Sequence, residues 1–153
     1  MLNKILNVLF MRVFRAKRAA KKFFNCLESE LAEEFLELLL RLMSLVFFLN
    51  KKYRQNIKDF YGRYLFQSKD KSITIAAIFE NSKMKVYEKE IDNTNVTIIF
   101  KDQHALMNFL LSPKPDILGA ILNQDVTYNG NLNYLSKFAY MAKRLQLTVA
   151  GDR

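Results

Sequence analysis

The chain has 153 residues, of which 50% are hydrophobic and 13% aromatic, and 24 basic against 15 acidic residues give it a formal net charge of +9. This length and composition exclude intrinsic disorder and predict one core, with enough further chain for an appendage. One cysteine, Cys26, and one histidine, His104, exclude an internal disulfide and the commonest zinc sites.

The first 26 residues combine an apolar stripe with positive charge. Apolar residues recur at helical spacing from Leu2 to Phe14, and the segment holds seven basic residues and no acidic one. This pattern is typical of an amphipathic helix in a membrane interface, where anionic lipid attracts the basic side chains. The residues expected to contact such a membrane are Leu2, Ile5, Leu6, Leu9, Phe10, Arg12, Arg15, Lys17 and Arg18.

Other interpretations of this segment remain open. The stripe also fits a helix that packs on its own domain or on a partner subunit. A nucleic-acid-binding arm would explain the charge but does not need the apolar stripe, so nucleic acid is a disfavoured partner. A signal peptide is disfavoured because Asn7 and Arg12 interrupt the apolar stretch and basic residues follow it.

Residues 27–49 predict a second helix. Its first half is acidic, which suits a helix N-terminus, and its second half is apolar almost all round. Glu37 and Arg41 interrupt it too early for a membrane span, so we expect buried packing or a homo-oligomer formed through residues 38–49. Residues 53–64 predict a third, basic helix that ends at Gly62. We therefore expect a helical region at 1–64 and a second domain at 65–150.

After Lys71 the apolar residues change from helical spacing to the alternation that is typical of strands. Alternating side chains predict strands at 73–79, 83–89 and 96–100, and the short polar turns between them predict an antiparallel meander. Two helical stretches begin at Asp102 and Ile117 and are separated by two prolines. A strand at 125–128, a turn in which Gly130 can supply a positive φ, and an amphipathic helix at 132–147 complete the chain.

This order of elements resembles the sterol carrier protein 2 family over residues 70–147. The likeness is carried by the strand end Phe100-Lys101-Asp102, an apolar helix, a segment after Pro115, and the strand-to-helix sequence Val126-Thr-Tyr-Asn-Gly-Asn-Leu. The resemblance implies an α+β fold with a five-stranded, mainly antiparallel sheet covered by helices, here preceded by the N-terminal helical region. It also implies a hydrophobic tunnel for acyl chains, sterols or related lipids, without covalent chemistry or a cofactor.

Candidate wall residues for such a tunnel are apolar side chains of the strands and helices. Any core would use the same residue types. They are Ile75, Phe79, Val86, Ile98, Phe100, Leu106, Phe109, Leu110, Ile117, Leu118, Ile121, Phe138, Met141 and Leu145. Met84, Met107 and Met141 could add adaptability.

The sequence offers few candidate catalytic side chains. His104 follows Asp102 at a helix start, where a cap or surface role is the simpler explanation, and the sequence has no phosphate-cradling Gly-rich loop. We therefore expect non-enzymatic lipid binding or transfer, and alternatively an accessory factor that presents lipid or quinone intermediates to a membrane-associated enzyme. The lone cysteine fits a reducing cytosol, so we expect the protein in the cytoplasm, free or peripheral on a membrane.

Overall fold

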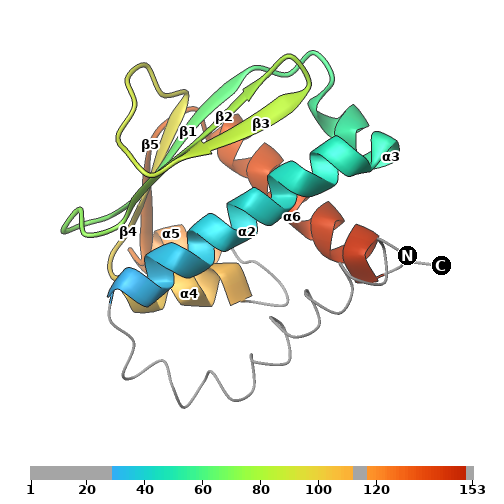
Figure 1. Cartoon of the computed structure of the whole chain (residues 1–153). Coiled ribbons are helices and arrows are strands. Elements are labelled where there is room, and N and C mark those ends of the chain that lie inside the picture. Colours follow the sequence, from blue (N-terminus) through green and yellow to red (C-terminus); the bar gives the residue numbers. More distant parts are fainter. Residues whose placement is uncertain (1–28, 112–116, 151–153) are drawn as a thin grey trace.

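A computed structural model describes residues 29–111 and 117–150 (Figure 1). The expected membrane-contact residues between Leu2 and Arg18 lie outside the described part. The elements, in chain order, are α2 (Ser29–Leu49), α3 (Lys51–Arg54), a 3-10 turn (Gln55–Ile57), β1 (Gly62–Ser68), β2 (Thr74–Glu80), β3 (Lys83–Tyr87), β4 (Val96–Phe100), α4 (Gln103–Leu111), α5 (Ile117–Leu122), β5 (Val126–Gly130) and α6 (Leu132–Ala150).

The strands form one five-stranded sheet in the order β3-β2-β1-β4-β5. Three of its pairings, β3 with β2, β2 with β1 and β4 with β5, are antiparallel, and β1 runs parallel to β4. The expected α+β class and the five-stranded, mainly antiparallel sheet are thereby confirmed. The parallel pair at the centre requires a crossover, and the β2–β3 hairpin lies within it.

The central strand β1 corrects two expectations. The helix predicted for 53–64 ends at Arg54 and a short 3-10 turn, and Gly62 begins a strand. Residues 64–68 are buried on both faces of the sheet, so they lack the apolar–polar alternation that marks a half-exposed strand. The expected meander is wrong at its third strand, because β4 pairs with β1 and not with β3. The expected boundary after residue 64 falls inside β1.

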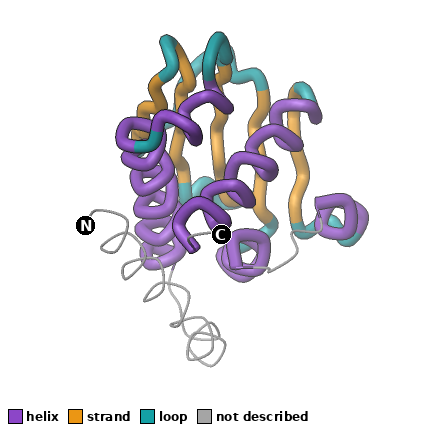
Figure 2. The backbone as a smooth tube through the Cα atoms, turned by 90° about the vertical axis from the view of Figure 1, so that its right-hand side faces the viewer, coloured by secondary structure: helices purple, strands orange, loops and turns teal. Residues whose placement is uncertain are grey.

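The helices gather on one face of the sheet (Figure 2). Tyr64 and Phe66 of β1 point to that face, and the ring of Phe138 from α6 lies 5.8 Å and 5.0 Å from theirs. Helix α2 runs along β3 and buries Leu36, Leu40, Met43 and Phe47 in the same core (Figure 1). The expected buried packing of this helix is thus confirmed for one of its faces. No described helix is long and apolar enough to cross a membrane.

Buried hydroxyls tie the helices to the core. The Tyr53 hydroxyl donates to the carbonyl oxygen of Met141 at 2.7 Å, and the Tyr64 hydroxyl donates to that of Tyr134 at 2.8 Å. At the start of α4, Asp102 accepts a hydrogen bond from the Ala105 amide at 2.8 Å, as a helix cap does. The two tyrosine bonds join α6 to α3 and to β1, and the Asp102 bond caps the start of α4.

Candidate functional site

The structure brings most of the expected wall residues together beneath the sheet. Their side chains pack against one another and against the helices as a hydrophobic core. The buried members are Ile75, Phe79, Ile98, Phe100, Leu106, Phe138, Met141 and Leu145, and Val86, Phe109, Ile117 and Ile121 pack partly buried against them.

Two expected wall residues are not part of this group. Leu118 on α5 has 67% of its surface exposed and points away from the core. The side chain of Leu110 lies outside the described part. Helix α5 buries none of its residues, so it covers the core only loosely.

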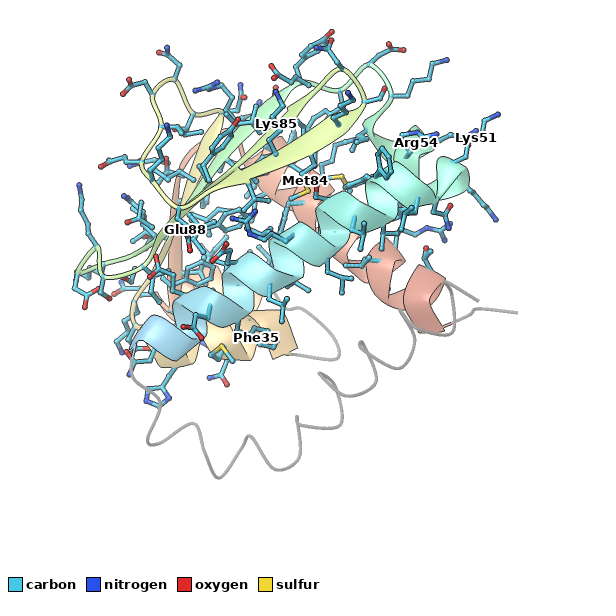
Figure 3. The ribbon with its side chains drawn as sticks, in the orientation of Figure 1. Phe35, Lys51, Arg54, Met84, Lys85 and Glu88 are labelled. Atoms are coloured by element: carbon cyan, nitrogen blue, oxygen red, sulfur yellow. The ribbon has the colours of Figure 1, made fainter. Side chains whose placement is uncertain are left out.

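A pocket of about 350 Å³ opens at the β3 edge of this core. It lies where the C-terminal end of α2 and helix α3 meet the β2–β3 hairpin, and the side chains of Arg54, Met84 and Lys85 are labelled there (Figure 3). Its walls are formed by Ser44, Phe47, Phe48, Arg54, Asn81, Ser82, Lys83, Met84 and Lys85.

The floor of the pocket is continuous with the core. Phe47 and Met84 are only 1% and 5% exposed and belong to the core cluster. Met84 is the register partner of Phe79, and the ring of Phe47 meets that of Phe79 edge to face at 6.1 Å. Both floor residues, Phe47 and Met84, therefore adjoin Phe79, which is one of the expected wall residues.

The rim of the pocket is basic. Lys83, Lys85 and Arg54 contribute cations, and no acidic residue is among the residues that form the walls. The Lys85 ammonium lies 3.1 Å from a carboxylate oxygen of Glu80, and that hydrogen bond raises the pKa of Lys85. Among the described residues, no carboxylate pairs with Lys83 or Arg54. The residues of the rim thus carry a net positive charge.

Local backbone chemistry positions these groups. Asn81 and Ser82 adopt positive φ angles of 51° and 57°, which give the two-residue hairpin a twist that matches its strands. Arg54 donates to the carbonyl oxygen of Phe48 at 2.8 Å and so satisfies the end of α2. The pocket wall is therefore fixed by a tight turn on one side and by a helix end on the other.

Of the wall residues of this pocket, the sequence had singled out Met84 alone, as an adaptable apolar side chain. The basic segment 51–54 and the lysines that alternate along β3 were visible in the sequence. Their meeting could not be inferred from local spacing, because the chain from Arg54 to Lys83 first forms β1 and β2. The only available signal was the charge itself.

The described residues do not present a metal centre. No group of three or more His, Cys, Asp or Glu side chains among them is placed to hold a metal ion. Among the described residues, the carboxyls of Glu37 and Glu88 share a hydrogen bond, which lowers the pKa of Glu37 and raises the pKa of Glu88. What this part of the chain offers is an apolar floor beneath a basic rim.

Comparisons with known proteins agree on the fold. No protein-family model matches the sequence, and a sequence comparison with curated proteins finds no match. A structure titled UbiJ-SCP2 ubiquinone synthesis protein is similar, with a TM-score of 0.54 and 14% identity over 77% of this chain and 93% of that chain. The sterol carrier protein domain 2 of Helicoverpa armigera gives a TM-score of 0.51 and 15% identity over 78% of this chain and 88% of that one.

A third similar structure belongs to a larger enzyme. A sec-alkylsulfatase aligns with a TM-score of 0.50 and 16% identity over 57% of this chain, but only 14% of that chain is covered. These likenesses concern the fold. The chain has the sterol carrier protein 2 fold, as the order of elements in the sequence suggested.

Proposed function

We propose that this chain, which has the sterol carrier protein 2 fold, binds a long apolar ligand with an anionic head and performs no covalent chemistry on it. The observation that carries the proposal is the pocket at the β3 edge, where a basic rim stands over a floor that belongs to the apolar core. A carboxylate or phosphate head would lie against Lys83 and Arg54. The apolar tail would lie on Phe47 and Met84.

The size of the pocket supports a partial enclosure of the ligand. At about 350 Å³ it is near the lower end of the ~300–1,000 Å³ typical of small-molecule sites. A tail longer than the pocket would have to displace Met84, whose flexible thioether side chain adapts readily to other shapes. It would then contact Phe79 and the other expected wall residues.

The energetics are compatible with reversible binding. Burial of ~200 Å² of apolar tail contributes roughly 5 kcal/mol at ~25 cal/mol per Å², before the cost of association. An exposed charge pair at the rim adds only ~0.2–1 kcal/mol. The tail therefore supplies most of the affinity, and the head supplies the orientation and the preference for anions.

A second candidate function is that of an accessory factor that presents lipid or quinone intermediates to a membrane-associated biosynthetic enzyme. It is supported by the likeness to a structure whose title names a ubiquinone synthesis protein. The two functions differ in what they require. Transfer needs only exchange of ligand with a membrane, whereas presentation needs a complex with an enzyme. Attachment of residues 1–26 to a membrane would serve either and remains a prediction.

Ligand binding by the full chain tests the proposal. Hexadecanoic acid and hexadecanol compete for a fluorescent fatty-acid probe, and the acid should displace the probe at lower concentration than the alcohol. Lys83→Glu should weaken binding of the acid about fivefold, which corresponds to ~1 kcal/mol, and leave the alcohol unchanged. Lys143→Glu, which changes an exposed lysine on α6, is the matched control. Equal effects of both variants on the acid would contradict the placement of the head.

A further inference from the structure

Helix α2 carries an apolar stripe beside its core-facing side that the chain's described elements bury only in part. Phe35, Leu38, Leu42, Leu45 and Leu49 follow one another at alternating spacings of three and four residues. Leu38, Leu45 and Leu49 are 56%, 45% and 41% exposed, and the other two are partly buried. We call these five residues the α2 seam.

The α2 seam has the pattern of a coiled-coil interface. Apolar residues spaced alternately by three and four form the contact line of paired helices. The core-facing residues of α2, such as Leu36, Leu40 and Met43, lie on a different face and are fully buried. A helix that is apolar on both faces is expected to be covered on both. One face meets the sheet, and Phe35 and Leu42 at the margin of the α2 seam pack partly against the same core. The exposed Leu38, Leu45 and Leu49 are left for another partner.

The charges along α2 identify a second copy of this chain as the partner. The first half of the helix carries the exposed Glu34, whereas the exposed Lys51 and Lys52 follow its C-terminal end. Glu33, Glu37 and Arg54 are already bonded within the chain. Figure 3 shows Lys51 and Arg54 at one end of α2 and Phe35 toward the other. Two copies packed antiparallel would place the acidic end of each helix against the basic end of the other, whereas parallel packing would bring like charges together.

The middle of the α2 seam is close to neutral. Arg41, the one basic residue there, forms an ion pair with Glu37 of the same helix. Antiparallel packing centred between Leu42 and Leu45 would let Leu38 contact Leu49 of the second copy and Leu42 contact Leu45 of the second copy. Such an interface is two-fold symmetric and uses the same residues from both copies.

We propose that the chain forms a homodimer through antiparallel packing of the α2 seam. From Phe35 to Leu49 the seam is about 22 Å long at ~1.5 Å per residue. This is short compared with stable interfaces, which bury ~1,600 Å² in total, so the dimer should dissociate in the micromolar range. The inference does not depend on the identity of the ligand.

Sedimentation velocity of the full chain tests the dimer. The wild-type protein should shift from monomer to dimer as its concentration rises through the micromolar range. Leu38→Glu with Leu45→Glu should weaken dimerisation at least about tenfold without unfolding, because both side chains are exposed in the single chain. Leu118→Glu with Leu122→Glu, two exposed leucines on α5, is the matched control and should dimerise like the wild type.

A charge exchange tests the orientation of the two helices. Glu34→Lys alone and Lys52→Glu alone should each weaken the dimer about threefold, and the double variant should restore it. A wild-type chain that stays monomeric would overturn the proposal, whether residues 1–28, a membrane or another protein covers the seam. A dimer that the leucine pair leaves intact would also overturn it. Failure of the double variant to recover would overturn the antiparallel arrangement. Ligand binding, measured separately with Lys83→Glu, is not expected to change with the seam variants.

Discussion

The hydroxyl of Ser44 donates a hydrogen bond to the main-chain carbonyl oxygen of Met84, with 2.7 Å between the two oxygens. Because β3 is the edge strand of the sheet, this carbonyl has no further strand beside it. The bond therefore joins α2 to the sheet edge and holds one wall of the pocket. The same residue pair links the helix that carries the α2 seam to the floor that we propose for the ligand.

Ser44→Ala should lower the free energy of unfolding by about 1 kcal/mol, because the Met84 carbonyl loses its hydroxyl donor in a partly buried place. Urea unfolding followed by circular dichroism measures the change. Ser136→Ala on α6, where the serine is exposed, is the control and should change stability by less than ~0.5 kcal/mol. Equal losses in the two variants would show that the Ser44 bond contributes nothing specific.

Alkaline pH should destabilise the protein through its buried tyrosines. Burial raises the pKa of Tyr53 and of Tyr64 above the ordinary value near ~10. The stabilisation from each is complete below that value and is lost as pH rises above it, because only the unfolded chain then releases the proton. Each tyrosine contributes up to ~1.4 kcal/mol per pH unit in this range.

Urea unfolding of Tyr53→Phe near neutral pH and at about pH 11 measures the pH-dependent stabilisation that Tyr53 contributes. The variant should be less stable at neutral pH, because the Met141 carbonyl loses its partner, and should lose less stability on going to high pH. Tyr61→Phe, a change at a 63% exposed tyrosine, should follow the wild type at both values. An unchanged pH dependence in Tyr53→Phe would contradict this explanation.

Gln67→Leu should stabilise the protein. Gln67 is 6% exposed on the sheet face away from the helices, and among the described residues its side-chain amide nitrogen has no hydrogen-bond partner. An unpaired buried polar group costs ~1–3 kcal/mol, and an apolar side chain of similar size removes that cost. Thermal unfolding should show a higher midpoint. A lower midpoint would mean that the amide has a hydrogen-bond partner outside the described residues.

Gly130→Ala should destabilise the junction of β5 and α6 by at least ~2 kcal/mol. Gly130 has a φ of 108°, and a Cβ atom there would lie 2.3 Å from the Asn95 carbonyl oxygen. Urea unfolding measures the loss. Asn129→Ala, at the exposed neighbouring position, is the control and should be nearly neutral. Similar stability of the two variants would contradict the steric argument.

More of the fold than of the candidate site could be predicted from the sequence. The expectation of a positive φ at Gly130 held because turn chemistry is local. Three strands were found from their alternation, and a fourth was expected at 125–128, before the turn. The fifth, β1, escaped because Leu65 and Gln67 are buried on the face opposite Tyr64 and Phe66, so no alternation was left to detect.

The candidate site depended on long-range pairing. The pocket forms only because β3 lies at the sheet edge beside α2, and strand order cannot be obtained from local spacing. Phe79 and Met84 were recognisable as apolar residues, but nothing in the sequence indicated that Phe47 and Arg54 would stand next to them. The expected wall residues remain a proposal for the deeper part of the ligand.

Mass spectrometry of organic extracts from the purified full chain tests the central claim most directly. An apolar acid or lipid phosphate should co-purify near one molecule per chain. Lys83→Glu should lower its amount, and Lys143→Glu should not. A chain that carries no such ligand and also fails to bind added hexadecanoic acid would contradict the account.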